Sequence, residues 1–127
     1  MPATILVVDD DPVIQKLLAV NFEMDGYRVV TASDGVEGLE RVADEGPDVV
    51  LLDVMMPRLD GVEVVRRLKA DATTAAIPVI LLSAKAQSSD ISAGLEAGAD
   101  DYVTKPFDPL ELLEKVAALI AGAGRSR

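Results

Sequence analysis

The sequence of 127 residues contains no cysteine and no histidine. Without cysteine it has no disulfide bonds, zinc–thiolate sites or thiol nucleophiles. Without histidine it has no imidazole base, no Ser-His-Asp triad and no phosphohistidine of its own. Basic residues are also few, since 12 Lys and Arg stand against 22 Asp and Glu, a formal net charge of −10. That charge disfavours nucleic-acid binding, which depends on neutralising phosphates, and leaves a chemistry of carboxylates, hydroxyls and lysines.

Long hydrophobic runs are absent as well. The longest, around residues 49–56, is interrupted by Asp53 and is too short to span a bilayer. The N-terminus lacks the basic stretch of a signal peptide, so we expect a cytoplasmic protein with no membrane contact. The length fits a single domain, which we place at residues 1–121, with residues 122–127 as a flexible C-terminal tail.

Short apolar runs alternate along the chain with segments of helical periodicity. The runs are rich in β-branched residues and mostly continuous, which is typical of strands buried on both faces; they cover residues 5–8, 27–32, 49–52, 79–82 and 102–103. The segment 27–32 resembles an edge strand. The helical segments begin near capping residues, at Asp11, Asp34, Asp60, Ser88–Asp90 and Asp108. This alternation predicts an α/β fold, a flavodoxin-like (βα)5 three-layer sandwich whose parallel sheet has the order 2-1-3-4-5.

Chemically active residues follow the predicted strands. Ligands of such sheets bind beyond the carboxyl ends of the strands, where this sequence has Asp9–Asp11, Asp53, Ser83 and Lys105. Asp11 has the position of a helix cap, and an isolated acidic pair is equally well explained as part of a solvated turn. Three crowded carboxylates, however, repel one another unless a cation compensates them. Oxygen ligands without His or Cys favour Mg²⁺, and such a pocket suits metal-assisted phosphoryl transfer.

Two enzyme classes fit Asp53 poorly. A Walker B carboxylate requires a GxxxxGK[ST] loop, which the sequence lacks. A phosphatase of the haloacid dehalogenase type requires a second Asp two residues after the nucleophile, where this chain has Met55.

Lys105 precedes Pro106, and a cis peptide bond between them would turn the lysine side chain inward.

Four motifs together resemble one known family. ILVVDDDP, VVLLDVMMPRLDG, VILLSA and GADDYVTKPF occur in this order and at that family's spacing. They resemble the receiver domain of two-component system response regulators (chemotaxis-Y-like), over residues 4 to about 121. The resemblance implies a phosphorylation-dependent signalling switch rather than an enzyme. Such a domain accepts a phosphoryl group from a partner histidine kinase or histidine phosphotransfer protein and catalyses only its own phosphorylation and dephosphorylation.

The resemblance implies a role for each motif residue. Asp53 is expected to be the phosphoacceptor, and Mg²⁺ is expected to bind Asp9, Asp10, Asp53 and the backbone carbonyl of Met55. Ser83 and Lys105 are expected to bind the phosphoryl group, Ser83 and Tyr102 to act as the switch, and Pro106 to follow a cis bond.

The resemblance also implies interaction surfaces. The phosphodonor is expected to dock near Val13 and Ile14 and the loop after Lys105, and the output surface to comprise the fourth helix, last strand and fifth helix. The downstream effector is unknown, and a homodimer through the fourth and fifth helices is left open.

Two further residues suggest a long-lived phosphoryl state: Met55, two residues after Asp53, and Lys85, two residues after Ser83. Two alternatives are a small Mg²⁺-dependent phosphatase or phosphotransferase and a phosphorylation-independent binding module of the same fold.

Overall fold

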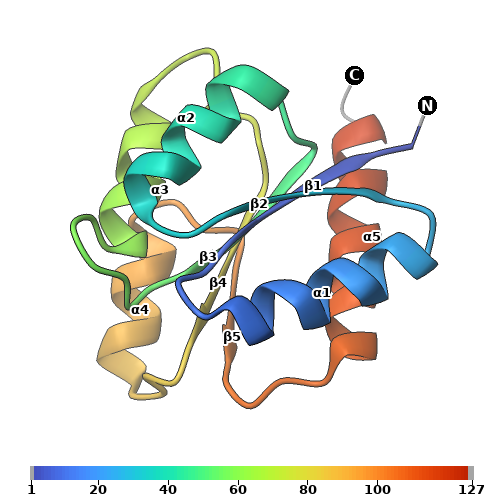
Figure 1. Cartoon of the computed structure of the whole chain (residues 1–127). Helices are drawn as coiled ribbons and strands as arrows, with labels where there is room; N and C mark the ends of the chain where they lie inside the picture. Colours follow the sequence, from blue (N-terminus) through green and yellow to red (C-terminus); the bar gives the residue numbers. More distant parts are fainter. Residues whose placement is uncertain (1, 126–127) are drawn as a thin grey trace.

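The computed structural model describes residues 2–125, in which five parallel strands alternate with five helices (Figure 1). The strands are β1 (Thr4–Val8), β2 (Arg28–Ala32), β3 (Val49–Asp53), β4 (Val79–Ser83) and β5 (Asp101–Thr104). The helices are α1 (Pro12–Met24), α2 (Gly35–Glu45), α3 (Gly61–Ala70), α4 (Ser88–Glu96) and α5 (Pro109–Arg125). The strand order is β2-β1-β3-β4-β5, which confirms the predicted flavodoxin-like fold and the edge position of residues 28–32.

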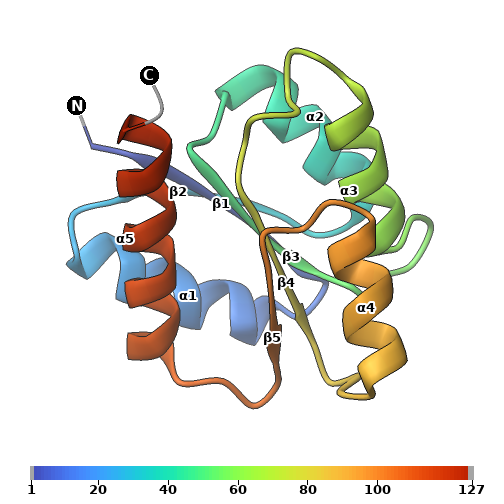
Figure 2. The ribbon, with the colours of Figure 1, turned by 180° about the vertical axis from the view of Figure 1, so that it is seen from behind.

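The helices cover both faces of the sheet. Helices α1 and α5 lie side by side on one face, and α2, α3 and α4 cover the other (Figures 1 and 2). Every neighbouring pair of strands is parallel, so each connection crosses over the sheet through a helix. All five strands therefore end at the same edge of the sheet.

Two hydrophobic clusters hold these layers together. Alternate residues of a strand point to opposite faces, so the central strands contribute to both clusters. Facing α1 and α5 lie Ile5, Val7, Leu18, Phe22, Val49, Leu51, Ile80, Leu82, Leu112 and Val116. Facing α2, α3 and α4 lie Leu6, Val8, Val42, Val50, Leu52, Val64, Val65, Leu68, Val79 and Leu81, with Ala32, Val54 and Ala99 at the margin. Burial on both faces explains why the strands read as continuous apolar runs.

The predicted helix caps are largely confirmed. The side chains of Asp11, Asp34 and Asp60 accept hydrogen bonds from backbone N–H groups in the first turns of α1, α2 and α3. The Glu37 carboxylate bonds to the backbone N–H of Ser33, one residue before the cap itself. Helix α4 begins at Ser88 as predicted, but its N-cap, Gln87, makes no side-chain capping bond.

Two details differ from the sequence prediction. Leu17 has the spacing of the core face, yet it is 41 % exposed, because the buried side of α1 is the narrower line through Leu18 and Phe22. Helix α5 continues to Arg125, beyond the expected end at residue 121, since a single glycine at position 122 weakens a helix by only about 1 kcal/mol. Residues 126–127 lie outside the described part, and the domain boundary at residue 121 stays a prediction. Among residues 2–125, no helix is both long and apolar enough to cross a membrane.

Candidate functional site

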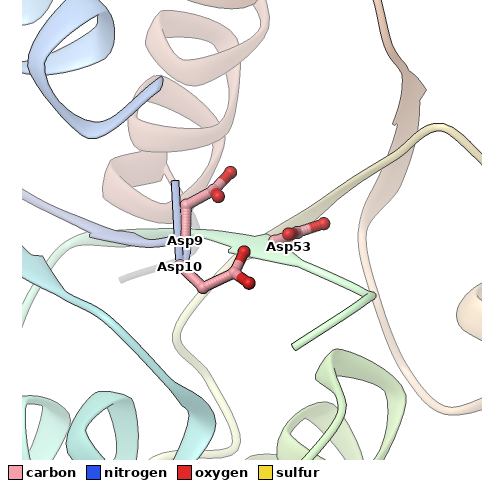
Figure 3. Close-up of side chains that lie close together, drawn as sticks. All are labelled: Asp9, Asp10 and Asp53. Atoms are coloured by element: carbon pink, nitrogen blue, oxygen red, sulfur yellow. The ribbon is translucent and has the colours of Figure 1, made fainter. Parts of the chain in front are cut away.

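Three carboxylates meet where β1 and β3 end. Strand β1 pairs with β3 through Val8 and Leu52, so Asp9 and Asp53 follow neighbouring positions of adjacent strands. One carboxylate oxygen each of Asp9, Asp10 and Asp53 lies within 4.8 Å of the other two. Figure 3 shows the three side chains extending to the same side of the strand ends. Asp9 and Asp53 are buried, whereas Asp10 is exposed.

Among residues 2–125, a single lysine reaches this acidic cluster, from the end of β5. Lys105 directly follows β5, and its Nζ donates to Asp9 Oδ2 at 3.1 Å and lies 3.6 Å from Asp53 Oδ1. The peptide bond between Lys105 and Pro106 is cis. One ammonium against three carboxylates leaves a local excess of negative charge, which a bound cation would relieve.

The ionisation of the cluster reflects this imbalance. Burial, together with the neighbouring Asp9 carboxylate, raises the pKa of Asp53 above its ordinary value. Burial acts to lower the pKa of Lys105, but its contacts with Asp9 and Asp53 outweigh burial, so that pKa lies above the ordinary lysine value. Lys105 is therefore a permanent cation beside a carboxylate whose charge is poorly compensated.

Ser83 lies at the end of the next strand. It is fully buried and follows Leu82, the residue of β4 that pairs with Asp53. Its Oγ accepts a hydrogen bond from the backbone N–H of Lys85 at 3.0 Å, and its carbonyl accepts one from the backbone N–H of Lys105 at 2.8 Å. Ser83 thus forms hydrogen bonds with both the loop after β4, at Lys85, and the residue that follows β5, Lys105.

Tyr102 borders a cleft next to the cluster. Its hydroxyl donates to the carbonyl of Lys85 at 2.8 Å, and its ring packs against Gly94 of α4. The cleft measures about 510 Å³ and is lined by residues that include Asp10, Met55, Lys85 and Tyr102. The Tyr102 side chain is half-buried: its ring lies between helix α4 and the cleft that it helps to line.

The loop between β3 and α3 is held closely against Asp53. The backbone N–H of Met55 donates to Asp53 Oδ1 at 3.3 Å, while the Met55 side chain is 53 % exposed. The N–H of Gly61 donates to the carbonyl of Val54 at 2.9 Å, and a Cβ at Gly61 would collide with the carbonyl oxygen of Asp53. The loop can close over the strand end only because residue 61 has no side chain.

Sequence reasoning missed Gln15. This residue of α1 donates from Nε2 to the carbonyl of Asp9 at 2.5 Å and to the carbonyl of Ala32 at 3.1 Å, with Ser33 Oγ at 3.3 Å. A neutral amide belongs to none of the four motifs. The one available signal was its place on the first turn of a helix that follows an acidic loop, and that signal is weak.

The donors present fit a hard divalent cation. All the side chains of the acidic cluster offer oxygen, and the sequence has no cysteine thiolate or histidine imidazole to add to them. Mg²⁺ takes one or two protein carboxylates, keeps several waters and binds phosphate oxygens, which suits an arrangement of two buried carboxylates and one exposed. The site can therefore hold a cation beside a buried carboxylate and a lysine.

A protein-family model matches most of the chain. A model described as "Response regulator receiver domain" matches residues 5–117 of this chain. That range contains all of the residues that form the acidic cluster and its surroundings.

Two curated relatives are named as regulators. The chain is 46 % identical over 95 % of its length to "DNA-binding dual master transcriptional regulator RpaA" of Synechocystis sp., and covers 50 % of that protein. It is 48 % identical over 94 % of its length to "Alkaline phosphatase synthesis transcriptional regulatory protein PhoP" of Bacillus subtilis, and covers 49 % of it. The chain thus spans about half the length of these relatives.

Two solved structures resemble the fold over nearly the whole chain. One is a CheY-like response regulator receiver domain protein of Methanospirillum hungatei, with a TM-score of 0.94, 28 % identity and complete coverage of both chains. The other is the receiver domain of the Francisella response regulator 1452, with a TM-score of 0.88, 36 % identity, and coverage of 98 % of this chain and 99 % of that one.

Proposed function

The chain belongs to the response regulator receiver domain family, and from this premise we propose that it is a phosphorylation-dependent switch whose phosphoacceptor is Asp53. The observation that carries the proposal is the contact between Lys105 and both buried carboxylates, in a cluster that has one cation for three carboxylates. The proposed phosphodonor is a histidine kinase or histidine phosphotransfer protein, because this chain has no histidine.

The proposed transfer uses the residues as they lie. An Asp53 carboxylate oxygen attacks phosphorus, the bond from phosphorus to the donor nitrogen breaks, and its electron pair stays on that nitrogen. Asp9, Asp10, Asp53 and the carbonyl of Met55 would hold Mg²⁺, which when bound would offset charge on the phosphoryl oxygens. Lys105 and the Ser83 hydroxyl would contact the phosphoryl group. The chain in this proposal modifies only itself and turns over no external substrate.

Phosphorylation would be read at the surface formed by α4, β5 and α5. New charge on Asp53 would draw Ser83 and the loop after β4 toward it. That movement would disturb the hydrogen bond from Tyr102 to the carbonyl of Lys85, since Lys85 belongs to the same loop. Ser83 and Tyr102 would then form the switch, with two packings whose populations depend on phosphorylation.

Intact mass tests the proposal. The chain is incubated with Mg²⁺ and acetyl phosphate, and we expect one labile phosphate per molecule. Asp53→Asn and omission of Mg²⁺ should each abolish the adduct. An unmodified mass, under conditions that label a known receiver domain, would overturn the proposal, and turnover of a generic phosphate ester would instead support a small phosphatase.

We place phosphodonor docking on the outer face of α1. Val13, Leu17, Val20 and Met24 are all exposed there, and Val13 follows Asp10 by three residues in the sequence. Val13→Glu should slow transfer from a phosphorylated donor protein while leaving labelling by acetyl phosphate unchanged. Leu95→Glu, an equally polar change at an exposed leucine of α4, is the matched control and should slow neither reaction.

We propose that the phosphorylated chain loses its phosphate slowly. Met55 cannot orient an attacking water, and Lys85 can pair with the phosphoryl group. Unchanged lifetimes in Met55→Asn and Lys85→Glu would contradict this.

We propose a cytoplasmic location, as is typical of the family. The charge of −10 argues against direct nucleic-acid contact by these 127 residues.

A further inference from the structure

The Asp9–Asp10 peptide unit is the part of the site that determines where the Asp10 carboxylate lies. Both carboxylate oxygens of Asp9 are held, because Oδ1 accepts from the N–H of Asp11 at 2.9 Å and Oδ2 accepts from Lys105. Its backbone N–H donates to the carbonyl of Ala32 at 3.0 Å. Asp10 has no comparable support, since no hydrogen bond or ion pair within residues 2–125 involves its exposed carboxylate.

The carbonyl of Asp9 is held by Gln15. The carbonyl oxygen and the following N–H belong to one rigid peptide plane, so holding the oxygen fixes the direction in which the chain enters Asp10. Gln15 Nε2 lies 2.5 Å from this oxygen and 3.1 Å from the carbonyl oxygen of Ala32, so its two N–H groups serve backbone acceptors at the ends of two neighbouring strands, β1 and β2.

We propose that Gln15 is a positioning residue, which orients the Asp9–Asp10 peptide and so directs the Asp10 carboxylate toward Asp9 and Asp53. This role rests on the proposed function, in which Asp10 is a metal ligand. Partners of metal ligands commonly set metal affinity, because a preoriented ligand loses less freedom on binding. In the absence of Gln15, the Asp9 carbonyl loses its partner and the peptide can rotate, which moves Asp10 away from the other two carboxylates.

The test separates hydrogen bonding from packing. Gln15→Met keeps the length and helix propensity of the side chain but removes both donors. Isothermal titration calorimetry should show Mg²⁺ binding weakened by about tenfold. The Mg²⁺ concentration that gives half-maximal labelling by acetyl phosphate should rise by a similar factor, while the rate at saturating Mg²⁺ stays within about twofold, because saturating metal restores the ligand geometry.

A control on the same helix excludes a general effect on α1. The Asn21 side chain donates to the carbonyl of Leu17 at 2.8 Å, away from the site. Asn21→Ala removes this bond and should leave Mg²⁺ affinity unchanged.

The outcomes distinguish this inference from the proposed function. If the wild-type chain binds no Mg²⁺, the proposed function itself fails. If the wild-type chain binds Mg²⁺ and Gln15→Met binds it equally well, Gln15 serves packing alone and the inference is overturned. An equal loss of affinity in Asn21→Ala would also overturn it, because the effect would then belong to the helix as a whole.

Discussion

The carboxylates at the two ends of the β-sheet have contrasting hydrogen-bond partners and charge surroundings. At the amino end, Asp48 accepts the N–H of Thr4 and Asp100 accepts the N–H of Val79, both at 2.8 Å. At the carboxyl end, the carboxylates of Asp9, Asp10 and Asp53 face one another with a single lysine. Each carboxylate at the amino end thus completes a strand end, whereas those at the carboxyl end are left with unbalanced charge.

A lysine completes the arrangement at the amino end. Lys69 Nζ donates to the carbonyls of Ala75 and Ile77 at 3.1 and 2.7 Å, and lies 3.7 Å from Asp100. This lysine therefore joins α3, the turn that follows it and the start of β4. The same residue types therefore stabilise the fold at one end, whereas at the other they form the acidic cluster that we propose binds a cation and a phosphoryl group.

The largest expected effect comes from filling the space beside Asp53. Gly61→Ala places a Cβ against the carbonyl oxygen of Asp53 and should lower the free energy of unfolding by about 3 kcal/mol. It should also abolish labelling by acetyl phosphate, because the β3–α3 loop must move away. Urea unfolding and intact mass measure both effects.

Gly122→Ala is the matched control for that substitution. Gly122 lies in α5, and a Cβ there meets nothing within 4 Å, so the change should stabilise the chain slightly through helix propensity. Equal destabilisation by the two substitutions would contradict the close approach at Gly61.

A smaller effect is expected at the amino end. Lys69→Met keeps the aliphatic stem but leaves two backbone carbonyls without their donor, and should cost about 2 kcal/mol of unfolding free energy. Labelling of the folded fraction should be unchanged. Lys16→Met, at an exposed lysine of α1, is the control and should change stability by less than about 0.5 kcal/mol. A loss of labelling in Lys69→Met would show that the two ends are not independent.

The smallest effect has the opposite sign. Without Mg²⁺, Asp53→Asn should raise Tm by roughly 2–4 °C at neutral pH, since it removes a poorly compensated buried charge. The pKa of Asp53 is raised in the folded state, so its ionisation opposes folding above that pKa, and the gain should shrink as pH falls through it. Mg²⁺ should raise the Tm of the wild-type chain and reduce the difference.

Asp48→Asn tests the comparison directly. Its amide oxygen can still accept the N–H of Thr4, so Tm should not rise at any pH. A rise equal to that of Asp53→Asn would contradict the difference between the two ends of the sheet.

Local sequence determined the elements of this fold because each has a local physical cause. The runs before Asp9, Asp53 and Ser83 are apolar throughout, as strands covered on both faces must be. Asp11 and Asp34 precede helices that their own side chains cap. The end of α5 was harder to predict, because glycine and alanine oppose each other there and neither dominates.

The candidate site could be predicted in part, through motifs at the strand ends. The order of the strands brings Asp9, Asp53, Ser83 and Lys105 to one edge of the sheet, so a topology inferred from sequence already implies that they are neighbours. Gln15 could not be found in this way, since its importance lies in two carbonyl groups, at Asp9 and Ala32, that carry no side-chain signature.

The sequence by itself determined the chemistry available to this protein: carboxylates, a serine and a lysine, with no histidine to donate a phosphoryl group. Only the tertiary structure decided how that chemistry is balanced. Whether a carboxylate stabilises the fold, as Asp100 does, or carries uncompensated charge, as Asp53 does, depends on which groups lie within a few ångströms. Those distances are set by packing between segments far apart in the chain, and electrostatic and hydrogen-bond energies change steeply over such distances.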